Sequence, residues 1–326
     1  MTSRLRIRRR RPRTRRLAAS ALVAVAVTAT TCTRPPTPPE PVAPRPGDAV
    51  VVASFDFPES EVLAQLYGQT IEAAGVPVRY ELGLGARELV MPALIRGLID
   101  VVPEYTGAAL EFLDGGSGLA VADEDVTYRE LREHLARRRL TALAASPAQD
   151  QNAFAVARTT AARFDLRAIS DLAGRSDDMS IGGPPECSER PLCLLGLERA
   201  YGLRFAEFVP LESAAAVAAA LADGAIDVGV LFSTDGTIQE HRLVALADDR
   251  RLQPAENVVP IVREEALERL GPSVARRLDA VSNMMTNVDL RVLNARVEFE
   301  GSSPSEVARD WLVGHDLPAP RDAAAG

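Results

Sequence analysis

The chain contains the same junction twice, at Arg96–Val101 (RGLIDV) and at Asp223–Val228 (DGAIDV). In each copy the end of a helical stretch meets a glycine, and an isoleucine–aspartate pair then leads into a strand-like run. A polar loop follows each junction, Pro103–Gly107 in the first copy and Ser233–Gly236 in the second. Loops at the carboxyl ends of strands are where open α/β sheets bind ligands. The repeat therefore predicts two equivalent lobes with a ligand held in the cleft between them.

Short β-branched runs alternate with stretches of helical periodicity along most of the chain. This alternation predicts an α/β fold in which each lobe is a mainly parallel sheet flanked by helices. We expect Asp100 and Asp227 to be structural residues at strand entries. The expected strands are Ala49–Ser54, Val76–Leu82, Ile99–Val102, Ala153–Ala157, Met179–Gly182 and Ile226–Phe232. The expected helices are Glu59–Ala74, Glu88–Arg96, Ala214–Ala222, Glu264–Leu270, Pro272–Met285, Val288–Phe299 and Ser303–Leu312.

The first 31 residues predict an export signal. Nine arginines precede Leu17, and the apolar stretch Leu17–Thr31 is too short to span a bilayer comfortably as a helix. Cys32 follows Ala29-Thr30-Thr31, which resembles the lipobox of bacterial lipoproteins, with Thr31 where Gly or Ala is usual. The resemblance implies a lipid on Cys32, with ordinary cleavage or an uncleaved anchor as the alternatives. Residues 32–48 are rich in proline and predict an extended tether.

The charge of the chain is sharply divided. The formal net charge is −8, and it becomes −17 once the nine arginines of the first 31 residues are removed. An acidic body repels nucleic acid and favours a cationic ligand. His134, His241 and His315 are isolated in the sequence, with no partner pattern for catalysis or metal binding. We therefore expect neither an enzyme nor a cofactor, and no nucleic-acid partner.

Several segments, in the same order, resemble the glycine betaine/choline/carnitine-binding proteins of osmoprotectant ABC importers. The most specific motif is Asp100–Gly107 (DVVPEYTG), and Phe232–Gly236 (FSTDG) lies where members have YSTDG. Ser54–Glu59 (SFDFPE) resembles the opening of the family pattern. Further matches are Leu84–Glu88, Pro92–Leu94 and the set Glu186, Arg190, Gly196, Leu197, Tyr201 and Gly202. The resemblance implies a type II periplasmic-binding-protein fold, with the ligand in the cleft between the two lobes.

This resemblance divides the chain into six segments. We expect the export signal at 1–31, the tether at 32–48, the first part of lobe 1 at 49–148, lobe 2 at 149–241, the return to lobe 1 at 242–318 and a tail at 319–326. The hinge would run through two crossovers, near Ser146–Asp150 and near Gln239–Leu243.

In that family an aromatic cage holds the quaternary ammonium group of the ligand, and polar groups hold a carboxylate. The resemblance implies that Tyr105, Phe154 and Phe232 are walls of the cage. Phe232 replaces the usual Tyr and gives a weaker cation–π face, and Ala214–Leu221 lacks an aromatic that members often have, so the cage is thinner. The other implied ligand-site residues are Ser54, Phe57, Glu104, Thr106, Gln151, Asn152, Arg190, Ser233, Thr234 and Asp235.

Structural roles compete with these assignments. For Tyr105 the alternative to ligand contact is a packing role in which the ring is partly buried. Phe154 and Phe232 lie beside apolar strand runs, so core packing is the alternative to ligand contact. Thr234 and Asp235 precede a helical stretch, where such residues commonly cap the helix.

Cys187 and Cys193 form a closely spaced pair, which in an exported protein predicts a disulfide. The bridge would stiffen a loop that borders the cleft. Arg190, inside the loop, is either a carboxylate clamp or an ion-pair partner of Glu186 or Glu189.

The resemblance implies a monomeric extracytoplasmic receptor, anchored by a lipid on Cys32, that delivers a small cationic or zwitterionic solute to ABC permease subunits. The solute would be glycine betaine, proline betaine, choline or carnitine, with ergothioneine as an alternative cationic metabolite. An enzyme or a non-transport signalling lipoprotein on the same fold are the competing classes. Turnover of the bound ligand would reveal the first, and uptake independent of this chain would reveal the second.

Overall fold

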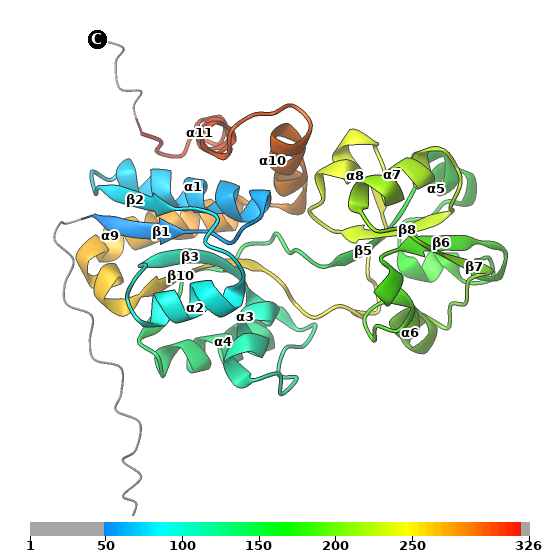
Figure 1. The fold of residues 1–326 in the computed structure, drawn as a ribbon, viewed down its shortest axis with the longest axis horizontal. Helices are drawn as coiled ribbons and strands as arrows, with labels where there is room; N and C mark the ends of the chain where they lie inside the picture. Colours follow the sequence, from blue (N-terminus) through cyan, green and yellow to red (C-terminus); the bar gives the residue numbers. More distant parts are fainter. Residues whose placement is uncertain (1–48, 321–326) are drawn as a thin grey trace, which may run out of the picture. The chain divides into compact units, whose positions relative to one another are not determined.

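The computed structural model describes residues 49–320, which form two five-stranded sheets flanked by helices (Figure 1). The strands are β1 (Val50–Ala53), β2 (Val78–Glu81), β3 (Val101–Tyr105), β4 (Leu140–Ala142), β5 (Asn152–Val156), β6 (Ser180–Gly183), β7 (Glu207–Pro210), β8 (Val228–Phe232), β9 (Val244–Ala245) and β10 (Val258–Arg263). The helices are α1 (Pro58–Glu72), α2 (Arg87–Ile95), α3 (Thr106–Asp114), α4 (Glu124–Ala136), α5 (Arg158–Phe164), α6 (Leu194–Gly196), α7 (Ala214–Ala222), α8 (Gly236–Glu240), α9 (Glu264–Met284), α10 (Asn287–Glu298) and α11 (Pro304–Gly314). Within residues 49–320 no helix is long and apolar enough to cross a membrane. The predictions for the signal, Cys32 and the whole tether at 32–48 lie outside the described residues.

The two sheets have the same topology. In the first, β1 is parallel to β2 and β3, and β10 is antiparallel to β3 and β4. In the second, β6 is parallel to β7 and β8, and β5 is antiparallel to β8 and β9. The predicted two-lobed α/β class is confirmed, but the sheets are mixed rather than mainly parallel. The equivalence of β3 and β8 places the loops after them at corresponding positions in the two lobes.

The antiparallel strand β10 completes the first sheet from a distant part of the chain. Pro260 lies in the middle of β10 and opposite Pro103 of β3 in the register. Pairing the two prolines confines the missing N–H donors to one position of the ladder. The second crossover also differs from our expectation near Gln239–Leu243. Because β9 pairs with β5, the chain leaves the second sheet only after Ala245.

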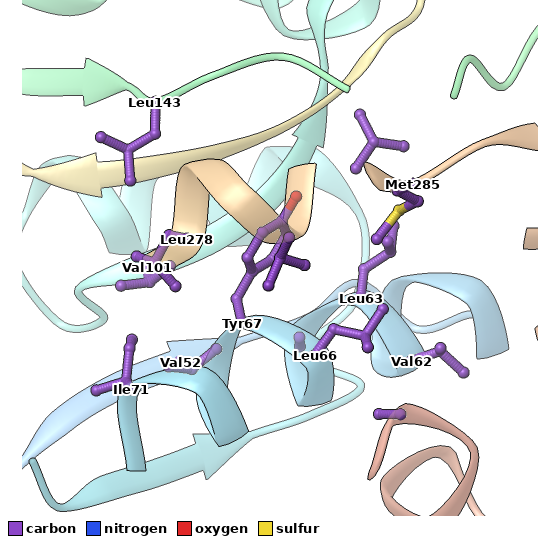
Figure 2. Packing of buried hydrophobic residues seen from close by; sticks show 14 of the residues in the cluster. Val52, Val62, Leu63, Leu66, Tyr67, Ile71, Val101, Leu143, Leu278 and Met285 are labelled. Carbon is purple, nitrogen blue, oxygen red and sulfur yellow. The ribbon is translucent and has the colours of Figure 1, made fainter. Parts of the chain in front are cut away.

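A single hydrophobic cluster joins α1 to β1, β3 and α9 in lobe 1 (Figure 2). Leu63, Leu66 and Ile71 recur at helical spacing on α1 and are fully buried. Tyr67 lies among them, and its hydroxyl is hydrogen-bonded to Ser282 Oγ at 2.9 Å, so the one polar atom of this side chain has a partner. The packing fixes α1 against the sheet and thereby fixes the position of its first turn, where the site begins.

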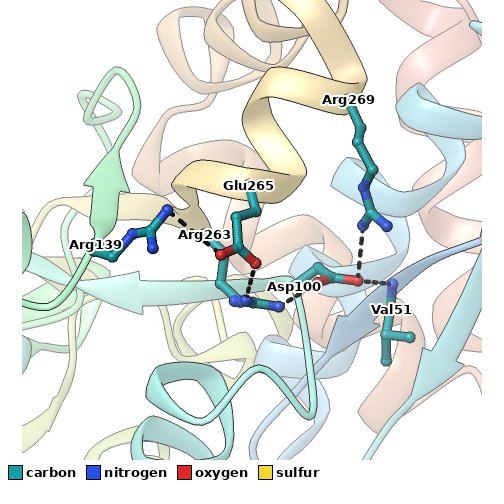
Figure 3. A network of polar contacts seen from close by, with 6 residues as sticks. All are labelled: Val51, Asp100, Arg139, Arg263, Glu265 and Arg269. Carbon is teal, nitrogen blue, oxygen red and sulfur yellow. Dashed lines mark hydrogen bonds and ion pairs between the residues drawn. The ribbon is translucent and has the colours of Figure 1, made fainter. Parts of the chain in front are cut away.

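Asp100 anchors the sheet of lobe 1 at the entry of β3 (Figure 3). Its Oδ2 accepts a hydrogen bond from Val51 N of β1 at 3.0 Å. Arg263 Nη1 lies 3.3 Å from Asp100 Oδ1, and Arg269 Nη2 lies 3.5 Å from Asp100 Oδ2. Asp227 has the corresponding position at the entry of β8, and its Oδ2 accepts a hydrogen bond from the backbone N of Ser180 in β6 at 2.9 Å. The predicted structural role of both aspartates is confirmed, since each side chain binds the backbone of the neighbouring parallel strand.

We expect Asp100→Ala to lower the free energy of unfolding by about 3 kcal/mol, because it leaves a buried N–H without this acceptor and removes the partner of two arginines. Asp227→Ala should cost about 1 kcal/mol, because its site is only half-buried. Urea unfolding of the purified protein measures both values. Equal losses in the two variants would contradict this account of the ion pairs.

Candidate functional site

The first turn of α1 places a buried carboxylate between several elements. Glu59 is only 6% exposed. Its Oε1 accepts a hydrogen bond from the Tyr105 hydroxyl, at the end of β3, at 2.6 Å, and its Oε2 accepts one from Asn294 Nδ2 of α10. Burial raises the pKa of Glu59, and these hydrogen bonds oppose the rise. A carboxylate so placed favours a positive charge or a proton nearby.

The polar loop after β8 brings lobe 2 to the same place. Thr234 Oγ1 donates to Asp150 Oδ1 at 2.9 Å, and Thr234 O accepts from Asn294 Nδ2 at 2.8 Å. Burial raises the pKa of Asp150 well above its usual range, the charge of Glu59 raises it further, and the Thr234 hydrogen bond opposes them. We call Glu59, Tyr105, Asp150, Thr234 and Asn294 the carboxylate network. It joins lobe 1, the first crossover and lobe 2.

One face of α10 holds the loop after β8. Asn287, Arg291 and Asn294 follow one another at helical spacing and all donate to Ser233 or Thr234. Asn287 Nδ2 lies 3.1 Å from Ser233 Oγ, and Arg291 Nε lies 2.7 Å from Ser233 O. Ser233 Oγ in turn donates to the backbone oxygen of the first crossover at residue 149, at 2.6 Å. The lobe-2 loop is therefore fixed by a helix that packs on lobe 1.

Aromatic rings lie beside the network in both lobes. Phe57 stacks on Tyr105 with ring centroids 6.4 Å apart, and on Phe55 at 5.8 Å. Phe57 is 36% exposed, so this stack presents a ring to the solvent. Phe232 ends β8 and is 56% exposed. Each exposed phenylalanine precedes a buried member of the network, Glu59 or Thr234, by two residues.

Two further carboxylates, the buried Glu104 and the half-buried Glu256, lie near Tyr105. Glu104 forms a bidentate pair with Arg87 at 2.9 and 3.0 Å and also accepts from Tyr105 N. Burial raises the pKa of Glu104, and the Arg87 charge opposes that rise. Glu256 accepts a hydrogen bond from Ala108 N at 2.9 Å, and burial raises its pKa to about 7. Glu104 is thus occupied by an internal arginine, and its predicted contact with the ligand stays a prediction.

Several predicted site residues have structural partners. Ser54 Oγ accepts from Gly83 N at 2.8 Å and donates to Phe55 O. Thr106 Oγ1 donates to the backbone at residue 255 and accepts from Asn257 N at 3.0 Å. Asp235 caps the N-terminus of α8, which is the structural role predicted as the alternative to ligand contact. Phe154 is fully buried in the core of lobe 2, as its core-packing alternative expects, and its contact with the ligand stays a prediction. β5 alternates its side chains between faces, and position 154 points inward.

The predicted disulfide between Cys187 and Cys193 is present. Its loop contacts the second crossover, because Gln253 Nε2 donates to Leu192 O at 2.8 Å. Asn152 Nδ2 donates to Gln253 Oε1 at 3.2 Å, beside Phe232 in the register. Arg190 is exposed in the same loop. The bridge thus supports one end of β5 and the crossover next to it.

An acidic groove of about 410 Å³ lies on the crossover side of the molecule. Its lining comes from the start of α4 and from both crossovers, and it includes Gln151, which donates to Pro254 O. The charged and amide residues of this lining are Asp123, Glu124, Asp125, Gln149, Gln151, Asp248, Arg251 and Gln253. An acidic lining of this kind agrees with the preference for cations predicted from the net charge.

The sequence did not identify Glu59, Asp150 or Asn294 as members of the site. Glu59 and Asn294 are joined across 235 positions of the chain, so no local pattern connects them. One signal was available on α10, where Asn287, Arg291 and Asn294 form a polar stripe on a helix that otherwise covers a core. Asp150 was assigned only to the crossover.

Comparison with known proteins gives a consistent result. Residues 48–313 match the family model described as the substrate binding domain of the ABC-type glycine betaine transport system. A glycine-betaine-binding protein of Pseudomonas aeruginosa is 28% identical over 80% of this chain and 86% of its own length. The glycine betaine-binding protein YehZ of Escherichia coli is 27% identical over 78% of this chain and 86% of its own.

A solved structure of YehZ and one further relative add to the comparison. The solved structure of apo YehZ has a TM-score of 0.78 at 26% identity, with 83% of this chain and 100% of that chain covered. An ergothioneine transport permease/ergothioneine binding protein of Helicobacter pylori, EgtU, is 26% identical over 81% of this chain and 47% of its own length.

The raised pKa of Glu256 predicts how stability changes with pH. With a folded-state pKa of about 7 and an ordinary value of 4.5, this side chain contributes stability that is complete below pH 4.5 and lost as the pH rises through 7. Glu256→Gln keeps an acceptor for Ala108 N but cannot ionise. Its free energy of unfolding relative to the wild type should therefore rise by about 2–3 kcal/mol between pH 5 and pH 8. Urea titrations at both pH values measure this difference, with exposed Glu111→Gln as the control. A difference that does not change with pH would contradict the prediction.

Proposed function

The chain belongs to the family of substrate-binding domains of ABC-type glycine betaine transport systems, and from this premise we propose that it captures a quaternary-ammonium solute and delivers it to its permease. The solute class is glycine betaine, proline betaine, choline or carnitine. The observation that carries the proposal is the pair of exposed rings, Phe57 in lobe 1, stacked on Tyr105 of the carboxylate network, and Phe232 in lobe 2, two residues before Thr234 of that network. Like its relatives, the chain binds a substrate and does not convert it.

The chemistry of the site fits such a cation. A quaternary ammonium group has no N–H and cannot be hydrogen-bonded, but the faces of aromatic rings attract it and exclude water with it. Stacking on Tyr105 and Phe55 holds the Phe57 ring in place, so that its exposed face can contact such a group. Burial raises the pKa of Glu59 and of Asp150, and a bound cation would favour the ionised form of both carboxylates, which in turn favours a positive ligand.

Ergothioneine is the second candidate ligand. A relative of similar identity carries ergothioneine in its name, and Phe232 of this chain lies where members of the family have tyrosine. A phenylalanine face attracts a compact cation less strongly than a tyrosine face, and it stacks equally well on a planar ring.

We also propose that the protein is a lipid-anchored monomer on the outer side of the cell membrane. The family works outside the cytoplasm with ABC permease components, and the basic and apolar segments before Cys32 support export and acylation. The proline-rich residues 32–48 then give the binding domain its distance from the membrane.

Phe57→Ala and Phe232→Ala should each weaken solute binding about tenfold or more, because each removes one ring face from the cation. Calorimetric titration with glycine betaine, choline, carnitine and ergothioneine measures the affinity and ranks the ligands. The matched control is Phe299→Ala, which removes a ring that is 41% exposed at the end of α10. Wild-type affinity in both Phe57→Ala and Phe232→Ala would exclude the aromatic site.

Cys32→Ser should release the protein from the membrane fraction, because the serine cannot carry the thioether-linked lipid. Fractionation of cells and detergent partitioning of wild type and variant measure this. Membrane retention of the variant would contradict lipid anchoring and favour an uncleaved signal.

A further inference from the structure

A second groove, of about 770 Å³, lies between lobe 2 and α10. Arg158 at the start of α5, Arg242 after α8 and Arg291 on α10 all line it, together with His241. Neutral polar and apolar side chains complete the lining, namely Thr159, Gln239, Ile238, Leu243 and Val288. A groove lined by three arginines is unusual on a body whose net charge is strongly negative.

These arginines have no internal counterion. Throughout residues 49–320 no Asp or Glu forms an ion pair with Arg158, Arg242 or Arg291, whereas Arg87, Arg263 and other arginines are paired. Arg291 is the most enclosed of the three. Its Nε is fixed by the hydrogen bond to Ser233 O at 2.7 Å, which leaves the rest of the guanidinium group to face the groove. Its pKa is lowered by desolvation, with no carboxylate to oppose this effect.

A partly buried guanidinium without a counterion costs free energy that an anion would recover. Guanidinium groups match the oxygens of phosphate in geometry and bind them through paired, charge-assisted hydrogen bonds. A multiply charged anion gains more from three arginines than a monovalent anion does, because each unit of its charge interacts with all three cations.

We propose that this groove is a second binding site, distinct from the solute site, and that it binds a phosphate-type oxyanion through Arg158, Arg242 and Arg291. The oxyanion comes either from free phosphate or from the headgroup of an anionic phospholipid. Both sources present the same chemistry to the three guanidinium groups.

Arg242 offers a variant that does not disturb folding. Its φ is +49°, in the left-handed region where glycine is favoured, so Arg242→Gly removes a charge and relieves backbone strain together. Arg251 has a φ of +56° and lines the acidic groove instead. Arg251→Gly is therefore the matched control, with the same change of charge and the same backbone conformation. Arg291 is left unchanged because it also holds the Ser233 loop.

The test measures the melting temperature of the purified full chain in phosphate and in chloride at equal ionic strength. Phosphate should raise the melting temperature of the wild type and of Arg251→Gly alike. Arg242→Gly and Arg158→Gln should each weaken phosphate binding about tenfold, while glycine betaine affinity stays within twofold of the wild type. Equal phosphate responses in Arg242→Gly and Arg251→Gly would overturn the proposal.

A second arm separates the two sources. Co-sedimentation with phosphatidylglycerol vesicles, against phosphatidylcholine vesicles, measures headgroup binding. Loss of phosphatidylglycerol binding in Arg242→Gly, but not in Arg251→Gly, supports the site with the lipid as its source. No response to either phosphate or phosphatidylglycerol in the wild type would also overturn the proposal.

Discussion

A carboxylate taken out of water must find donors or a counterion, and the donors of Glu59 come from distant parts of the chain. Tyr105 reaches it from the end of β3 and Asn294 from α10, and the same Asn294 binds the lobe-2 loop. The arrangement of α1, β3, α10 and the loop after β8 is therefore set by one buried group. The solute site depends on it, because the exposed rings Phe57 and Phe232 are each fixed two residues before a member of the network.

The features that could be predicted from the sequence are those carried by local patterns. The repeated junction gave the two lobes and the roles of Asp100 and Asp227, and the cysteine spacing gave the disulfide. β10 was missed because Pro260 argues against a central strand, and only its pairing with Pro103 makes that strand possible. The carboxylate network was missed because its members meet only after both lobes have folded. For Phe154 the sequence left ligand contact and core packing both open, because a strand residue can face either way, and the structure places the ring in the core.

The two charged regions of this acidic protein differ in the charge that they favour in a ligand. The network and the nearby groove place Glu59, Asp150 and Asp123–Asp125 where a cation gains most, and Arg87, near Tyr105, is already paired with Glu104. In the groove between lobe 2 and α10 the three arginines have no such partners among the described residues. One face of α10 contributes to both regions, because Asn294 binds Glu59, and Arg291, three residues earlier, lines the arginine groove. A single helix thus carries a donor to the buried carboxylate and a cation of the groove, about one turn apart.

The position of β10 in the first sheet sets the order in which the lobes can fold. Lobe 2 is one uninterrupted stretch from β5 to the segment after β9, where Leu252 packs on its core and Gln253 binds Leu192 O, so a chain that appears with its N-terminus first can complete that lobe as soon as residue 253 is free. Lobe 1 begins earlier but finishes later, because β3 and β4 have no common neighbour until residues 258–263 arrive between them. Until then its central strand exposes an unpaired edge, which is the surface most prone to aggregation. Lobe 1 is therefore the lobe that most needs protection from aggregation until the whole chain is available to fold.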